Sequence, residues 1–284
     1  MMIIDFHTHT FPDKMAEAAV SALEQKANLR RHTEGTNDSL KESMKKAGVD
    51  ISVILPVVTN PLKTSHINQF AAELNERELK AAGQRLFSIA GIHPLCENYK
   101  ELLDEAYKLG LRGIKLHPDY YGIDFADIRM KRIISYASEI GLFVITHAGM
   151  DIGLYPPVCC SIPSILEVLE DVNPTKLVLA HMGGWMNWDE VTEKLCDKNV
   201  LIDTAFSVGH IDWLEPKGHK DYSLMDEEKF LKMIRAFGID RVLFATDSPW
   251  ADQSDYTRIM ADLPLTEDER EKIMHANAEK LLGL

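Results

Sequence analysis

The sequence predicts a single-domain (β/α)8 barrel, the TIM barrel, spanning residues 1–284. The chain length of 284 residues is near the roughly 250 residues that are typical of one such barrel. About eight short runs rich in Val, Ile and Leu alternate with segments of helical periodicity. These runs lack polar alternation, which is typical of parallel strands covered by helices on both faces. No Gly-x-Gly-x-x-Gly follows any run, which disfavours a dinucleotide-binding sheet.

The expected strands are apolar runs that end at turn residues such as Gly and Pro. In order they cover residues 2–6, 49–58, 86–92, 111–117, 142–146, 177–180, 200–205 and 242–245. The expected helices carry apolar residues at helical spacing, and several end at a glycine. They cover residues 13–28, 38–47, 65–82, 99–109, 128–140, 162–172, 189–196, 227–237, 256–263 and 267–282. The least regular stretches, 30–37 and 208–224, are expected to be surface or lid loops.

The composition favours a cytoplasmic enzyme that acts on a small molecule. A formal net charge of −13 without a local basic cluster repels a polyphosphate backbone, so no nucleic-acid partner is expected. No segment approaches the roughly 18 uninterrupted apolar residues of a membrane span, and the N-terminus shows no secretory signal. The four cysteines lack zinc-ribbon spacing and are expected to be reduced thiols. A homo-oligomer is compatible with the sequence, because the exposed helices of a barrel often pair.

The first strand ends in His7-Thr8-His9, which is a candidate metal clamp. Side chains on a strand repeat with a period of two, so both imidazoles project from one face, about 7 Å apart along the strand. Two imidazoles at this spacing can lean onto one ion. Asp5 is expected to point away from His7. A His-x-His also arises by chance in a chain with 11 histidines, so the other strand ends must decide.

Polar side chains recur where the expected strands end. In a barrel of this type the active site lies at the C-terminal ends of the strands, and Gly or Pro follows closely after most of these positions. Six of the 11 histidines gather at this rim, together with one lysine and one aspartate: His7, His9, His93, Lys115, His117, His147, His181 and Asp247. Such a concentration predicts a metal-dependent active site.

These motifs resemble those of the metal-dependent amidohydrolase superfamily. The resemblance is carried by the His-x-His at 7–9, the single histidines His147 and His181, and Thr-Asp-Ser-Pro at 246–249. It is closest to the amidohydrolase-related branch, which includes aminocarboxymuconate semialdehyde decarboxylase and related decarboxylases. It covers nearly the whole chain, and it is specific for the superfamily rather than for the reaction.

The resemblance implies a ligand set. His181 would polarise or deprotonate the metal-bound water, and the metal ligands would be His7, His9, His147 and Asp247. Binuclear members carry a carboxylated lysine or a glutamate at strand four, where this chain has Lys115 and His117. One metal ion and an unmodified Lys115 are therefore expected, with a carbamylated Lys115 that bridges two ions as the alternative.

This ligand set suits a specific chemistry. Three neutral imidazoles and one carboxylate favour Zn²⁺, with Mn²⁺, Fe²⁺ or Co²⁺ as substitutes. Such an ion lowers the pKa of bound water from about 16 towards roughly 7. Asp247 can then accept a proton from that water, and His181 can take or return one. The remaining side chains near the strand ends are expected to hold the substrate, with the lysine facing a carboxylate or an oxyanion: His93, Lys115, His117 and Trp250.

The leading expectation is a metal-dependent hydrolase that acts on an amide, ester or lactone bond of a small, carboxylate-bearing molecule. A metal-dependent decarboxylase of an unsaturated acid is the alternative, because the same site can deliver hydroxide or a proton. A non-catalytic metal-binding barrel is the third hypothesis. Substrate specificity lies in loops whose shape the sequence does not give.

Overall fold

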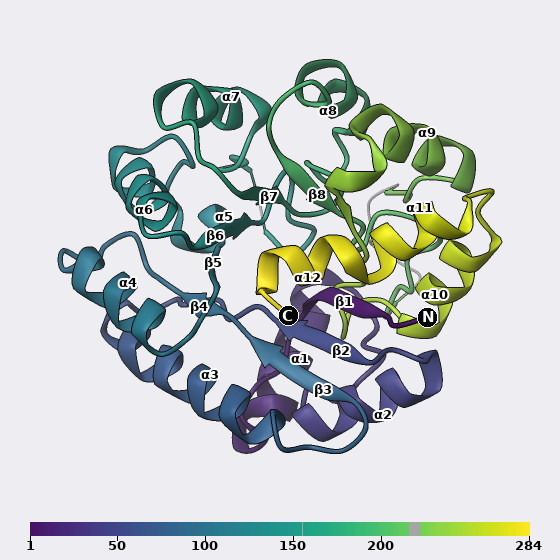
Figure 1. Cartoon of the computed structure of the whole chain (residues 1–284), viewed down its shortest axis with the longest axis horizontal. Helices are drawn as coiled ribbons and strands as arrows, with labels where there is room; N and C mark the ends of the chain where they lie inside the picture. The colour runs from purple at the N-terminus through teal and green to yellow at the C-terminus, as the bar shows by residue number, and fades with distance from the viewer. Residues whose placement is uncertain (155, 216–221) are drawn as a thin grey trace.

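The computed structural model describes residues 1–154, 156–215 and 222–284 (Figure 1). Residues 216–221, within the expected lid loop 208–224, lie outside the described part of the chain. Across the described residues, no helix combines the length and the apolar character needed to cross a bilayer.

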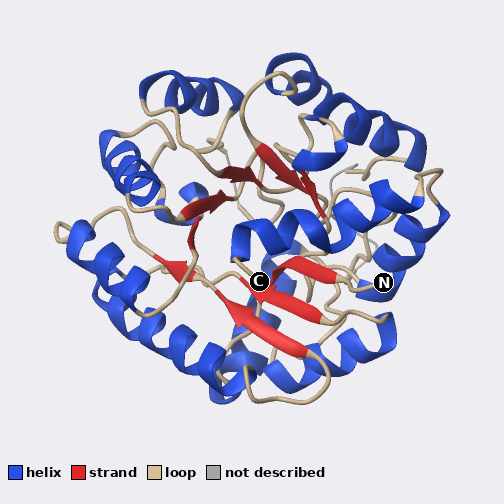
Figure 2. Cartoon of the chain, in the orientation of Figure 1, coloured by secondary structure: helices blue, strands red, loops and turns tan. Residues whose placement is uncertain are grey.

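The strands lie at the centre of the molecule and the helices surround them (Figure 2). All neighbouring strands pair in parallel. The strands form two sheets, of order β1-β2-β3 and β4-β5-β6-β7-β8-β9. Their bounds are β1 Ile4–Thr8, β2 Ile51–Ile54, β3 Arg85–Ser88, β4 Ala90–Gly91, β5 Gly113–Leu116, β6 Phe143–Thr146, β7 Leu177–Leu179, β8 Leu201–Asp203 and β9 Val242–Leu243.

Backbone hydrogen bonds join the two sheets at both of their junctions. β3 and β4 are separated by Ile89 alone, whose N–H donates to the Ile54 carbonyl of β2 (3.3 Å). They therefore form the single strand expected over residues 86–92. On the other side, the Phe6 N–H of β1 donates to the Phe244 carbonyl after β9 (2.9 Å), and Thr8 forms a parallel bridge with Ser248. The expected (β/α)8 barrel is confirmed.

Helices follow the strands and cover the outside of the barrel (Figure 1). The larger ones agree with the expected segments to within a few residues. The bounds are α1 Asp13–Ala27, α2 Asn37–Ala47, α3 Thr64–Glu78, α4 Tyr99–Lys108, α5 Pro118–Tyr121, α6 Ile128–Glu139, α7 Ile162–Asp171, α8 Trp188–Leu195, α9 Glu227–Phe237, α10 Gln253–Asp262, α11 Glu267–Glu271 and α12 Asn277–Leu282. Short 3-10 turns cover Pro61–Lys63 and Ile239–Arg241. The short α5 was not expected from the sequence.

The C-terminal segment differs from the single helix expected over residues 267–282. A π-helix, Lys272–Ala276, separates α11 from α12. The Ile273 carbonyl within it accepts the Phe244 N–H that follows β9 (3.0 Å). The wider π turn thus supplies a backbone carbonyl that accepts a hydrogen bond from the barrel. This is a tertiary contact, which the helical spacing of apolar residues does not reveal.

Apolar side chains fill the N-terminal end of the barrel interior. Inward-facing apolar side chains of the strands, including Ile4, Phe6 and Phe143, form one buried cluster with Leu281 and Leu282 of α12. Figure 1 shows α12 lying across the middle of the strands in this view. α12 closes the N-terminal end of the barrel. The polar residues at the C-terminal ends of the strands therefore lie at the opposite end.

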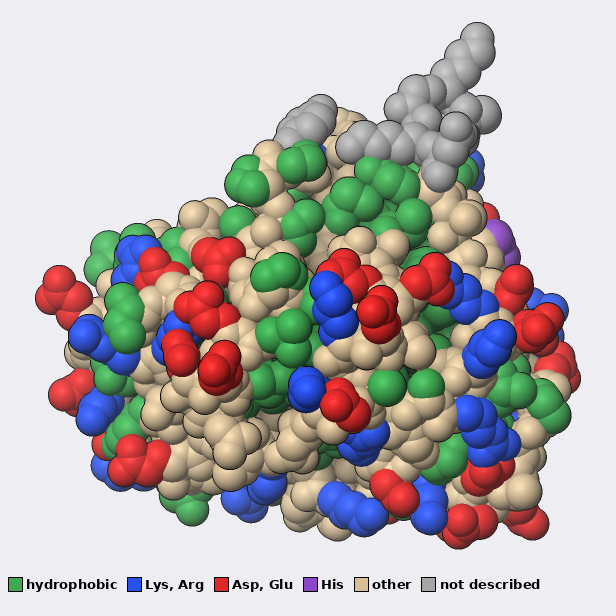
Figure 3. Space-filling model, turned by 90° about the horizontal axis from the view of Figure 1, so that it is seen from above, with side chains coloured by type: hydrophobic (Ala, Val, Ile, Leu, Met, Phe, Trp, Pro, Cys, Tyr) green, Lys and Arg blue, Asp and Glu red, His purple; other side chains and the backbone are tan. Residues whose placement is uncertain are grey.

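Charge on the outer surface is mixed. On the face drawn in Figure 3, acidic and basic side chains lie interspersed among apolar ones. The net charge of −13 is therefore not concentrated in one acidic patch on that face.

Candidate metal centre

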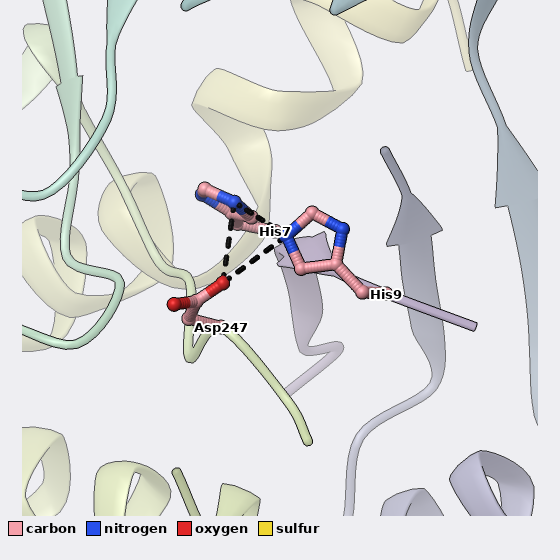
Figure 4. Close-up of side chains that lie close together, drawn as sticks. All are labelled: His7, His9 and Asp247. Carbon is pink, nitrogen blue, oxygen red and sulfur yellow. Dashed lines mark hydrogen bonds and ion pairs between the residues drawn. The ribbon is translucent and has the colours of Figure 1, made fainter. Parts of the chain in front are cut away.

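Three predicted metal ligands converge at the C-terminal end of the barrel. His7 Nε2 and His9 Nε2 lie 3.2 Å apart. Asp247 Oδ1 lies 3.4 Å from the first nitrogen and 3.2 Å from the second. Figure 4 shows both rings and the carboxylate pointing towards one another, with His7 on β1, His9 just after β1 ends and Asp247 beyond β9. We call His7, His9 and Asp247 the metal triad.

A β-bulge in β1 places the histidine pair. Asp5 pairs with Ser52 of β2, whereas Thr8 pairs with Ile54. Three residues of β1 therefore advance against two of β2, which leaves one extra residue and changes which side chains face inward. His7 joins Phe6 on the inner side because of this bulge.

Asp5 contacts a different part of the fold. Its carboxylate accepts hydrogen bonds from Thr246 Oγ1 (2.6 Å) and from Gln253 Nε2 of α10 (2.7 Å). It meets His7 only at the backbone N–H (3.3 Å). Strict alternation would place Asp5 on the face of the histidine pair, so it is the bulge that directs Asp5 away from the His7 ring. Burial raises the pKa of Asp5 to about 7, although its hydrogen bonds oppose this shift.

The hydrogen-bond partners of the two rings fix where their protons lie. His7 Nδ1 is 2.8 Å from Asp203 Oδ2, and His9 Nδ1 is 2.9 Å from the Leu55 carbonyl. Both partners are acceptors, so each neutral ring carries its proton on Nδ1 and a lone pair on Nε2. Burial, followed by the charge of Lys115, lowers the pKa of His7 well below its usual value and keeps it neutral.

The metal triad fits a divalent ion. Two imidazole lone pairs and a carboxylate oxygen face one another without a proton between them, which is unfavourable unless a cation lies there. The separations of 3.2–3.4 Å also match the roughly 3.4 Å between ligand atoms of a tetrahedral ion with bonds of about 2.0–2.1 Å. The donor types and their spacing both suit a transition metal.

The backbone holds Asp247 in place. Its N–H donates to the His7 carbonyl (2.8 Å), and its own carbonyl accepts the Trp250 N–H (2.8 Å). Its φ of +71° lies in the left-handed region, which aspartate tolerates better than most residues. This turn directs the carboxylate back over β1.

Lys115 lies beside the metal triad, as its strand-end position predicts. Lys115 is 1% exposed, and its Nζ lies 3.3 Å from His7 Nε2. Burial lowers the pKa of Lys115 to about 8, although the carboxylates of Asp203 and Asp247 oppose this shift. An ammonium here is a ready partner for an anionic substrate group.

His147 and His181 form a hydrogen-bonded pair next to the triad. His181 Nδ1 lies 3.0 Å from the Ala205 carbonyl, and His181 Nε2 lies 3.0 Å from His147 Nδ1. If His181 donates from Nδ1, then His147 donates from its own Nδ1 and keeps a lone pair on Nε2. His147 Nε2 is buried without a partner among the described residues. It is the next imidazole nitrogen available as a metal ligand, although it lies outside the compact triad.

A second group of candidate ligands contains His117, His147 and Asp151. His117 Nε2 lies 3.3 Å from Asp151 Oδ2. The His117 and His147 rings are stacked, with centroids 4.3 Å apart and an interplanar angle of 10°. Imidazole lone pairs lie in the ring plane, so stacked rings direct them along parallel paths that do not converge. This arrangement suits a metal ion less well than the converging atoms of the metal triad do.

The other predicted substrate-binding residues lie at the edges of this region. His93 is buried and packs edge-on against Tyr121 of α5 (4.8 Å between centroids). Burial also lowers the pKa of His93. Trp250 lines a neighbouring surface cleft with His32 and Asp212. Lys115 and His117 therefore contact the predicted ligands His7 and His147 through their side chains, whereas Trp250 meets Asp247 through its backbone N–H.

Close backbone packing holds the loops after β6 and β7 together. Gly149 has a φ of +81°, and a Cβ on it would lie 2.3 Å from the Trp185 backbone nitrogen. The Trp185 N–H donates to the Ala148 carbonyl (2.9 Å). This contact fixes the segment after His147 against the segment after His181, so the two histidines keep their relative positions.

Two carboxylates that contact site histidines were not predicted from the sequence. Asp203 ends β8 and contacts His7, and Asp151 lies four residues after His147 and contacts His117. Asp203 had a usable signal, since it is the one acidic residue within the expected apolar strand 200–205. Asp151 lies in a loop and had no comparable signal.

A family model described as amidohydrolase matches residues 4–284. Among curated proteins, none matches the chain significantly.

Several solved structures resemble the whole chain. An uncharacterized TIM-barrel protein from Bordetella bronchiseptica has a TM-score of 0.76 at 21% identity, covering 100% of this chain and 99% of that one. A dihydroxybenzoic acid decarboxylase from a Polaromonas species, with bound manganese and the inhibitor 2-nitroresorcinol, has a TM-score of 0.70 at 14% identity, covering 100% and 97%. A putative amidohydrolase from Staphylococcus aureus has a TM-score of 0.66 at 17% identity, covering 100% of both chains. These likenesses agree with the barrel fold.

Proposed function

This chain belongs to the amidohydrolase family, and we propose from that premise that it is a metal-dependent hydrolase of a small, carboxylate-bearing molecule. The bond that it cleaves would be an amide, an ester or a lactone. The proposal rests above all on the convergence of His7 Nε2, His9 Nε2 and Asp247 Oδ1, which lie 3.2–3.4 Å apart.

The metal triad would hold one divalent ion, with His147 as the additional imidazole donor. An ion in such a site supplies hydroxide at neutral pH by lowering the pKa of water towards about 7. Imidazole and carboxylate donors favour Zn²⁺, and Mn²⁺, Fe²⁺ or Co²⁺ suit them as well. Manganese, which the similar Polaromonas decarboxylase contains, is therefore a natural second choice. The single ion agrees with the stacked geometry of His117 and His147.

The surrounding side chains supply the remaining functions. Asp247 would accept the proton of the attacking water through its carboxylate. Once its bond to His147 opens, His181 could take up that proton at Nε2 and pass it to the leaving group. Lys115 binds the substrate carboxylate or a developing oxyanion from its buried position beside His7. His117, whose Nδ1 is buried and without a partner among the described residues, offers a further hydrogen bond to the substrate.

Decarboxylation is the second candidate. Lys115 favours it, because a buried ammonium 3.3 Å from His7 Nε2 can hold a carboxylate next to the metal triad. Several of the similar structures are decarboxylases, including one for 2,6-dihydroxybenzoate and one for 5-carboxyvanillate. The two reactions need the same metal site but give different products.

A product assay tests the proposal. Metal-stripped protein is reloaded with Zn²⁺ or Mn²⁺ and incubated with a panel of carboxylate-bearing lactones, esters, amides and unsaturated or aromatic acids. Released acid or amine is measured separately from released CO₂. The expected result is turnover that needs metal, that a chelator abolishes, and that yields a hydrolysed product without CO₂.

Two results would contradict the hydrolase proposal in different ways. Metal-dependent release of CO₂ without hydrolysis would assign the chain to the decarboxylases. Stoichiometric metal binding without turnover of any member of the panel would favour the non-catalytic metal-binding barrel.

A further inference from the structure

Asp203 lies beneath the metal triad without belonging to it. It is the last residue of β8, and it is completely buried. One carboxylate oxygen, Oδ2, contacts His7 Nδ1 at 2.8 Å. The other, Oδ1, accepts the backbone N–H groups of His181 (2.8 Å) and Ala205 (3.2 Å). One side chain therefore connects a predicted metal ligand with the residue expected to transfer protons.

Asp203 determines which nitrogen of His7 is free. A carboxylate oxygen at Nδ1 accepts a hydrogen bond, so the His7 proton stays on Nδ1. The lone pair is then on Nε2, the atom that faces His9 Nε2 at 3.2 Å and Asp247 Oδ1 at 3.4 Å. A donor in place of Asp203 Oδ2 would favour the opposite tautomer, which has a proton on Nε2.

Asp203 also supports the strained turn that carries His181. His181 and Met182 both have left-handed backbones, with φ values of +58° and +55°. Such conformations are unfavourable in non-glycine residues and persist where the surroundings hold them. The His181 N–H donates to Asp203 Oδ1 (2.8 Å), and the Met182 N–H donates to the Asp203 carbonyl (2.7 Å).

We propose that Asp203 is a positioning residue that holds His7 in its metal-binding tautomer and fixes the His181 turn beside it. This inference rests on the proposed metal-dependent function. It concerns residues of this chain, so metal binding and ring protonation can test it without any substrate.

The first test is Asp203→Asn, which keeps the shape of the side chain. The asparagine oxygen can still accept the His181 N–H, while its NH₂ group faces His7 Nδ1 as a donor. His7 must then carry its proton on Nε2, where it blocks the ligand lone pair. Loss of such an orienting partner typically weakens metal binding by about 10–100-fold. We expect this increase in the Mn²⁺ dissociation constant, measured by calorimetry on metal-stripped protein.

Thr204→Val is the matched control. Thr204 is the neighbouring residue, it is fully buried, and its Oγ1 exchanges two hydrogen bonds with the Ala245 backbone (2.7 and 2.8 Å). Its loss should lower the melting temperature and leave the Mn²⁺ dissociation constant unchanged. If Thr204→Val weakened Mn²⁺ binding as much as Asp203→Asn does, the effect would be general loosening and the inference would be overturned.

Direct observation of the tautomer covers the case in which Asp203→Asn does not fold. Nitrogen-15 NMR of the His7 ring in metal-stripped wild-type protein should show protonated Nδ1 and unprotonated Nε2. The opposite tautomer, or wild-type Mn²⁺ affinity in Asp203→Asn, would overturn the role of Asp203. If wild-type protein bound no metal, the proposed function would fail as well.

Discussion

His7 Nε2 and His9 Nε2 lie 3.2 Å apart, although each ring donates its only proton in the opposite direction, from Nδ1. Two lone pairs are thereby turned towards each other and towards Asp247 Oδ1. Without a cation, these three atoms make no favourable contact with one another, whereas around a cation all three become ligands. The hydrogen bonds to Asp203 and Leu55 therefore prepare the metal triad before any ion arrives.

His9→Ala should remove metal binding while leaving the fold intact. The His9 side chain is 18% exposed, so its truncation leaves a small solvent-accessible gap rather than a sealed cavity. Loss of one of three converging ligands should weaken Mn²⁺ binding by more than the roughly 100-fold that loss of an outer-shell partner produces. Elemental analysis after dialysis measures the change. His210→Ala is the control, because His210 is 64% exposed and contacts Asp212 instead of the triad.

His181→Asn should separate turnover from metal binding. Asparagine cannot transfer a proton, and loss of general acid–base catalysis typically costs about 10²–10⁴-fold in rate. We expect kcat to fall by this factor while bound metal stays near one equivalent. Loss of the metal together with activity would instead indicate that His181 acts by supporting His147, whose Nδ1 it contacts at 3.0 Å.

Lys115→Met should weaken binding of the substrate carboxylate. Methionine fills the buried stem but has no ammonium group, so a carboxylate-bearing substrate should show a KM raised by roughly 10-fold or more, in line with loss of a charge-assisted hydrogen bond. A neutral analogue of the same substrate should be much less affected. Unchanged kinetic constants for the carboxylated substrate would remove Lys115 from the substrate-binding residues.

Gly149→Ala should destabilise the site more than an equivalent change elsewhere. A Cβ at Gly149 would lie 2.3 Å from the Trp185 backbone nitrogen, whereas a Cβ at Gly141 would meet no atom within 4 Å. The φ values of both residues are close, at +81° and +85°, so both variants lose about 1–2 kcal/mol to the left-handed backbone. Chemical denaturation should show a clearly larger loss for Gly149→Ala. Equal losses would mean that the loops after β6 and β7 move apart without any loss of stability.

Asp119→Asn should change how stability depends on pH. Burial, followed by nearby carboxylates, raises the pKa of Asp119 from 3.8 to about 6. The folded protein therefore binds more protons than the unfolded chain between these two values, so this group favours folding at low pH and loses that contribution as pH rises through about 6. The melting temperature of Asp119→Asn minus that of wild type should therefore increase as the pH rises from 4 to 7. A difference that is constant with pH would show that Asp119 titrates normally.

Local sequence patterns were sufficient to predict most of the barrel. Apolar runs such as 142–146 correspond to β6, and the glycine after the run of residues 128–140 marks the end of α6. The rule that the active site of such a barrel lies at the C-terminal ends of its strands also grouped residues far apart in the chain. Two of them, His7 and Asp247, lie within 3.4 Å of each other. These features depend on periodicity and on the geometry of parallel strands, which the sequence carries directly.

Other features depend on tertiary contacts and escaped prediction. The bulge between Asp5 and Thr8 arises from register with β2, and the π turn arises because Ile273 accepts the Phe244 N–H. Asp203 stands out in its apolar run, but nothing in the run shows that its partner is His7, which lies 196 residues away. In each case the partner lies far away in the sequence.

Anomalous diffraction from crystals soaked in Mn²⁺ locates the bound ion itself. If the metal triad holds the ion, one strong peak lies within bonding distance of His7 Nε2, His9 Nε2 and Asp247 Oδ1. A peak between His117 and Asp151, or no peak within reach of the metal triad, would contradict that placement of the ion.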